Sequence, residues 1–163
     1  MKRITNLALA AVVSVALGGV ALASSHGGGK KMEAMASGPV AERQQVMKDI
    51  KKNFVPLVKM VKGAQPFDAA TVKKNAEAIA ALLEKAGKLF PEGSDKGDTR
   101  AKPEIWLMPE DFQAIMKTAT EKAKALAGVS SADQLAPAVM ALGGKGCKAC
   151  HEKFRKPKEK KKM

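Results

Sequence analysis

The sequence predicts an all-α fold, an antiparallel four-helix bundle, on three observations. Ala, Lys, Glu, Leu and Met dominate the composition, whereas Tyr is absent and Trp occurs once. Helix-forming residues at this density argue against a sheet. Four stretches carry apolar residues at intervals of three and four, the spacing of one helix face. Mostly short connections favour antiparallel neighbours, although the repeat alone does not distinguish up-down-up-down from other bundle topologies.

The N-terminal residues read as a secretory signal rather than as part of the fold. Lys2 and Arg3 are positive, residues 7–20 are almost wholly apolar, and Ala-Leu-Ala at 21–23 is a small-x-small cleavage pattern. We therefore expect a signal peptide at 1–23 and a periplasmic protein. An uncleaved N-terminal anchor is the alternative, but the apolar run is short for a membrane span. Residues 24–38 are polar and rich in Gly, which indicates a flexible leader.

The first two amphipathic stretches have clear start and stop signals. The first begins near Pro39, a favoured residue in a first helical turn, and Pro56 inside it should bend the helix or remove one backbone hydrogen bond. Asp68 is a suitable N-cap for the second. The apolar spacing of the second stretch continues to Phe90, and Pro91 then stops it.

A polar connection at 91–103 follows, which is long for a link between helices and is therefore expected to contribute to a site. The third stretch begins around Pro109, where two acidic residues suit the positive end of a helix dipole, and it stops at Gly128.

The fourth stretch starts at Ser130 or Ser131, either of which is a good N-cap, and ends by residue 157. The bundle is thus expected to span 39–156. A Lys-rich tail at 157–163 is expected to be solvated.

The fourth stretch contains Cys147-Lys148-Ala149-Cys150-His151, the attachment pattern of a c-type haem. Residues three and four apart share one helix face, so two thiols can bond to the haem vinyl groups while the imidazole approaches the iron. Thioether bonds would consume the only two cysteines of the chain and leave no disulfide. Three alternatives compete: a thioredoxin-type redox pair at a helix N-terminus, a zinc site with about four ligands, and a structural disulfide, which is awkward within a helix.

Three glycines, Gly143, Gly144 and Gly146, precede the motif. Each costs about 1 kcal/mol relative to Ala inside a helix. Close approach of a bulky planar group to the backbone would explain this cost, and local fraying of the helix is the alternative.

A haem motif in the last helix of such a bundle resembles the class II c-type cytochromes, the cytochrome c′ family. Three segments carry the resemblance: Arg43-Gln44, residues 97–106 and residues 147–155. It implies thioether bonds at Cys147 and Cys150 and an iron bond from His151.

The resemblance also places other residues around the cofactor. Arg43 and Gln44 would flank the haem edge, with the guanidinium near a propionate, and Asp98 and Thr99 would contact the same edge. For these four residues the alternatives are a solvated polar face and ordinary loop capping.

Met47 occupies the position that corresponds to the family's distal residue. In many members this residue is apolar and keeps the sixth iron site empty, whereas some low-spin members bind iron through a Met sulfur. We expect Met47 to ligate the iron, because a thioether is a suitable soft ligand. Core filling is the alternative, since Met47 lies on the apolar stripe.

The resulting expectation is a periplasmic electron carrier, not an enzyme, with one covalent haem c and acidic redox partners attracted by a net charge of +13. The alternative is a five-coordinate cytochrome c′ that binds nitric oxide or carbon monoxide. A peroxidase-like enzyme lacks an evident distal acid–base residue, and the near absence of interleaved aromatic residues argues against nucleic acid. The family resemblance also implies a homodimer.

A separate hypothesis comes from the leader. Cleavage after Ala23 would give a chain starting Ser24-Ser25-His26, whose amine, two amides and imidazole can surround Cu(II) or Ni(II) in a square plane. The sequence leaves open whether this segment binds metal.

Overall fold

The computed structural model describes residues 38–158, and all the secondary-structure elements named in this range are helices. In chain order the elements are α1 (Pro39–Val61), α2 (Ala69–Gly87), α3 (Glu104–Leu107), α4 (Pro109–Ala127), α5 (Ala132–Ala141), the π-helix η1 (Leu142–Lys148) and α6 (Ala149–Phe154). The expected signal peptide, most of the leader and the end of the basic tail lie outside the described residues. Within the described part, no helix is long and apolar enough to span a membrane.

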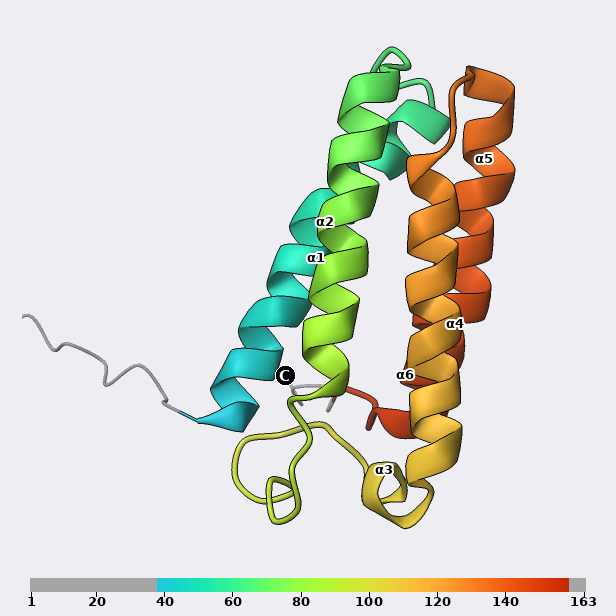
Figure 1. Ribbon diagram of the computed structural model, residues 1–163. Coiled ribbons are helices and arrows are strands. Elements are labelled where there is room, and N and C mark those ends of the chain that lie inside the picture. Colours follow the sequence, from blue (N-terminus) through green and yellow to red (C-terminus); the bar gives the residue numbers. More distant parts are fainter. Residues whose placement is uncertain (1–37, 159–163) are drawn as a thin grey trace, which may run out of the picture. The chain divides into compact units, whose positions relative to one another are not determined.

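Four rods run alternately in opposite directions (Figure 1). They are α1, α2, α4 and a fourth rod in which α5, η1 and α6 follow one another without a break. α2 packs against α1 and α4, and the fourth rod packs against α4 and α1, which closes the bundle. The predicted four-helix bundle is therefore confirmed, and its topology, which the sequence left open, is up-down-up-down.

Local signals account for the helix starts. Pro39 occupies the first turn of α1, and the Asp68 carboxylate accepts hydrogen bonds from the backbone N–H groups of Ala70 and Thr71 at 3.2 and 3.1 Å. Pro109 opens α4, with Glu110 and Asp111 in the first turn as predicted. The helix α1 continues through Pro56 to Val61.

α2 ends earlier than its apolar spacing predicts. The last helical residue is Gly87, and Phe90 lies beyond the helix. Phe90 precedes Pro91, and the residue before a proline is disfavoured in the α region, which accounts for the early stop. The Phe90 ring still reaches the interior, where it meets the edge of Phe112 with centroids 4.8 Å apart.

Aliphatic side chains from all four rods fill the core. The largest fully buried ones are Leu57, Val72, Ile79, Leu126, Leu135 and Leu142. Each such side chain contributes about 1.5–3 kcal/mol by leaving water. One end of the bundle differs from the other in its connections. There α1 and α4 begin, α2 and α6 end, and the connection 88–103 crosses between the rods (Figure 1).

Candidate functional site

The residues of the haem motif lie on the fourth rod near this end. Cys147 belongs to η1, whereas Cys150 and His151 belong to α6. Both thiols are free and half-buried. Cys150 and His151 line a cavity of about 570 Å³, and Cys147 packs against the core. The helical path therefore brings Cys150 and His151 to the wall of one cavity, with Cys147 packed on the core one helical turn before them.

The π-helix η1 was not predicted from the sequence. It covers residues 142–148, the glycine-containing turns before the motif, and π-helical turns recur at functional sites. Glycine is needed here for helix packing: a Cβ on Gly146 would lie 3.1 Å from both Cα and Cβ of Ala119 in α4. A Cβ on Gly144 would meet nothing within 4 Å. The three glycines were expected to let a planar group approach the backbone closely. This expectation is wrong for Gly146, where the missing side chain lets α4 approach instead.

The cavity has mainly apolar walls from several elements. Its apolar lining includes Met47, Phe90, Ile105, Phe112, Met116 and Phe154. Met47 comes from α1 and is half-buried, while Met116 comes from α4 and is 5% exposed. Volumes of 300–1,000 Å³ and apolar walls are typical of cofactor sites.

Burial keeps the two thiols and the imidazole of the haem motif uncharged. It raises the pKa of the Cys150 thiol to about 11 and also raises that of Cys147, so both are thiols at neutral pH. Burial lowers the pKa of His151 to about 4, with smaller contributions from the positive charges of Arg155 and Arg100. A neutral imidazole has a free nitrogen lone pair, which iron ligation requires.

Arg43 is buried, with 4% of its surface exposed, and its guanidinium holds the connection after α2. Nη1 donates to the Leu89 carbonyl at 3.3 Å and to Ser94 Oγ at 3.0 Å. Nη2 donates to the Ser94 carbonyl at 2.7 Å and to Thr99 Oγ1 at 2.8 Å. The guanidinium also lies 4.9 Å from the centre of the Phe90 ring. Burial lowers its pKa, and Asp95 partly opposes this.

The structure brings the four predicted edge residues together. Gln44 Nε2 donates to the Asp98 carbonyl at 2.7 Å, next to the Arg43–Thr99 hydrogen bond. Arg43, Gln44 and Thr99 line the cavity, whereas the Asp98 side chain is exposed and lies outside the lining. These hydrogen bonds join α1 to the connection after α2, and the role of the four residues toward a haem carboxylate stays a prediction.

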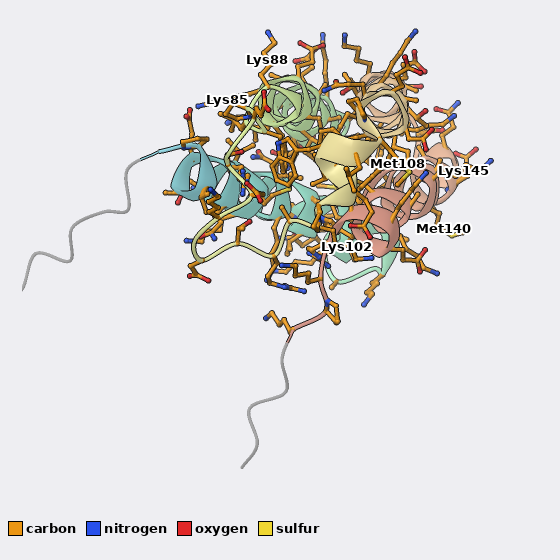
Figure 2. All side chains as sticks on the ribbon, turned by 90° about the horizontal axis from the view of Figure 1, so that it is seen from below. Lys85, Lys88, Lys102, Met108, Met140 and Lys145 are labelled. Atoms are coloured by element: carbon orange, nitrogen blue, oxygen red, sulfur yellow. The ribbon has the colours of Figure 1, made fainter. Side chains whose placement is uncertain are left out.

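The connection after α2 is also joined to the end of α6, which the sequence did not predict. Ala101 forms an antiparallel bridge with Arg155, and the Lys102 N–H donates to the Phe154 carbonyl at 3.0 Å. Lys102 Nζ donates to the carbonyls of Glu152 and Lys153, the last turn of α6. Figure 2 views the molecule from this end and shows Lys102 beside α6. The segment 100–102 thus fastens the chain directly after His151.

The chemistry of the cavity fits a covalently held haem. Two neutral thiols and one neutral imidazole stand at or beside a wall of apolar side chains. In the described residues, no group of three or more His, Cys, Asp or Glu side chains could hold a bare metal ion. Two guanidinium groups on the lining, those of Arg100 and Arg155, suit the carboxylates that haem carries.

Comparison with known proteins gives a consistent result. A family model described as cytochrome C′ matches residues 38–155. A cytochrome c′ of Pararhodospirillum photometricum is 39% identical over 120 residues, covering 71% of this chain and 94% of that one.

Two solved structures illustrate the similarity in fold. Cytochrome c prime from Shewanella frigidimarina aligns with a TM-score of 0.67 at 34% identity, over 73% of this chain and 94% of that one. A ferrous variant of cytochrome c prime from Alcaligenes xylosoxidans with bound NO aligns with a TM-score of 0.67 at 30% identity, over 74% and 94% of the two chains.

Proposed function

This chain belongs to the cytochrome c′ family and has haem c as its cofactor, and we propose that it binds a small gas ligand, nitric oxide or carbon monoxide, at the haem iron. The observation that carries the proposal is the 570 Å³ cavity, which has His151 on its lining together with apolar side chains from α1 and α4. Of the two functions expected from the sequence, the comparisons favour this one, since similar solved structures hold nitric oxide.

In this proposal each residue of the motif has a separate role. Cys147 and Cys150 would hold the haem through thioether bonds, and the imidazole of His151 would bind its iron. When bound, the haem would supply an iron that can bind a diatomic gas. The pKa of His151, lowered to about 4, keeps its nitrogen available for the iron throughout the neutral range.

Met47 is proposed to form part of the wall over the gas-binding face. Its side chain is half-buried on the cavity lining. A flexible thioether in such a position excludes water and bulky ligands while still admitting a diatomic molecule. An apolar, water-poor face favours a neutral gas over water or an anion as the sixth ligand.

Electron transfer is the second candidate, and the position of Met47 is the observation that favours it. A Met on the lining of the cavity that His151 also lines is available as a second axial ligand, and His/Met ligation raises the reduction potential. In that case Met47 would occupy the gas position, and acidic redox proteins would be the partners.

Carbon monoxide binding to the reduced holoprotein separates the two candidates. The gas-binding proposal expects a high-spin ferrous spectrum, fast carbon monoxide binding and at most a small change in Met47→Leu. Met116→Leu, a change on the same lining, is the matched control. A low-spin reduced spectrum, together with a Met–iron charge-transfer band in the oxidised protein that is lost in Met47→Leu but kept in Met116→Leu, would overturn gas binding and select the electron carrier.

We also propose a periplasmic, homodimeric binding protein rather than an enzyme. The N-terminal signal pattern supports export. Among the described residues, the lining holds no Asp or Glu, so no carboxyl group stands ready to transfer protons to a bound peroxide. Cell fractionation, light scattering on the eluted holoprotein and a peroxidase assay test the three parts separately.

A further inference from the structure

Positive side chains from three segments surround the cavity. Lys48 and Lys51 come from α1, Arg100 comes from the connection after α2, and Arg155 and Lys158 follow α6. We call these five residues the basic rim. Lys48, Lys51, Arg155 and Lys158 are exposed and Arg100 is half-buried, so the charge faces solvent at the mouth of the cavity.

None of the five side chains of the basic rim forms an ion pair with a carboxylate in the described part of the chain. The ion pairs found there, such as Lys85–Glu42 and Lys124–Glu84, involve other lysines. The Arg100 guanidinium does bind a group, but this is the neutral carbonyl of Lys156. Five like charges around one opening repel one another, and an approaching anionic surface would relieve this repulsion.

The cofactor alone does not neutralise the basic rim. A haem carries two carboxylates, which can pair with at most two of the five cations. At least three positive charges therefore stay around the opening in the holoprotein. They surround the site that the haem fills, and positive charges grouped around a redox site steer an oppositely charged partner protein and raise the rate of encounter.

We propose that the basic rim is the docking surface for an acidic one-electron donor protein, which reduces the haem through its edge at the cavity mouth. In the transfer one electron passes from the donor to the ferric iron, giving ferrous iron and an oxidised donor, and no bond is made or broken. The inference goes beyond gas binding: it concerns how the iron is reduced and holds whether or not Met47 ligates.

The test measures reduction of the ferric holoprotein by two donors in a stopped-flow instrument. A reduced plant-type ferredoxin serves as the acidic protein probe, and photoreduced lumiflavin serves as an uncharged donor. The double change Lys48→Glu/Lys51→Glu reverses two charges of the rim. Lys74→Glu/Lys117→Glu is the matched control, since both lysines are exposed, lie inside helices and line no described cavity.

We expect the ferredoxin rate at low salt to fall about tenfold in the rim variant and to change little in the control, because steering raises association rates by 10–10³-fold. Added salt should slow the wild type and remove the difference. The lumiflavin rate should be equal in all three proteins, which shows that the haem site is intact. Lys158→Glu should give a smaller fall.

Equal ferredoxin rates in the rim and control variants would overturn the proposal. So would a fall in both the ferredoxin and the lumiflavin rates, because that would place the lysines in the haem site itself. Binding to vesicles containing phosphatidylserine that is lost in the rim variant, with unchanged ferredoxin rates, would assign the rim to lipid. Carbon monoxide binding is measured separately, so its failure would refute gas binding without affecting this result.

Discussion

Replacing Arg43 with Ala should destabilise the holoprotein by about 3 kcal/mol. Two of the four hydrogen bonds that Arg43 donates are buried and go to Ser94, and each hydrogen bond from a charged donor contributes about 1.5–3 kcal/mol. The other two, to Leu89 and Thr99, are partly buried, and we expect the cost of burying the guanidinium to offset them. Counting only the two hydrogen bonds to Ser94, at about 1.5 kcal/mol each, gives a loss of about 3 kcal/mol.

Chemical denaturation of the holoprotein measures this loss, and thermal unfolding should show a fall in Tm of roughly 10 °C. Lys59→Ala, a change at an exposed lysine of the same helix, should stay within about 0.5 kcal/mol. A double-mutant cycle with Ser94→Ala should show coupling of about 1 kcal/mol or more, because the two side chains are joined directly.

Additivity of the Arg43 and Ser94 changes, together with a loss of stability below about 1 kcal/mol, would refute this role of Arg43. A large shift in reduction potential with little loss of stability would instead show that Arg43 acts mainly on a haem carboxylate. The sequence resemblance predicted that second role, and the hydrogen bonds to the connection favour the first.

Three further predictions address attachment, packing and the leader. Acid–organic extraction should leave haem on the wild type but remove any that binds Cys147→Ala/Cys150→Ala; a bleached wild type would contradict covalent attachment. Gly146→Ala should cost about 1–3 kcal/mol in urea unfolding, because its Cβ would press on Ala119 at 3.1 Å, whereas Gly144→Ala meets nothing within 4 Å and should stabilise by about 0.5–1 kcal/mol. If the mature chain begins at Ser24, the wild type should bind one Cu(II) more than His26→Ala in a titration; a different N-terminus or equal uptake would exclude this site, which lies outside the described residues.

Local sequence signals located most of the helices. The first-turn prolines of α1 and α4 and the Asp68 cap act within a few residues, so they can be read from the chain without knowing the fold. The haem motif is likewise local. That its residues share one helix face follows from helical spacing, whereas the cavity that this face meets is built from several distant segments.

Features that depend on two distant segments could not be predicted. The close fit of Gly146, within the π-helix, against Ala119 could be seen only from how the fourth rod packs on α4. The partners of Arg43 lie 46 to 56 residues away along the chain. The resemblance placed Arg43, Gln44, Asp98 and Thr99 in one region, but their hydrogen bonds appear only when α1 and the connection are packed together.

The double attachment of the connection has a consequence for the order in which the molecule assembles. The hydrogen bonds of the connection to α1 and to residues 154–156 close chain loops of about 50 residues. Closing each loop costs chain entropy, and few contacts close in sequence offset that cost. Such long-range bonds gain strength only after the rods have come together, so this end of the bundle should order last. Until then the thiols and the imidazole on the fourth rod would stay accessible for haem attachment. Closing the connection over them afterwards converts an accessible substrate for that chemistry into an enclosed cofactor site.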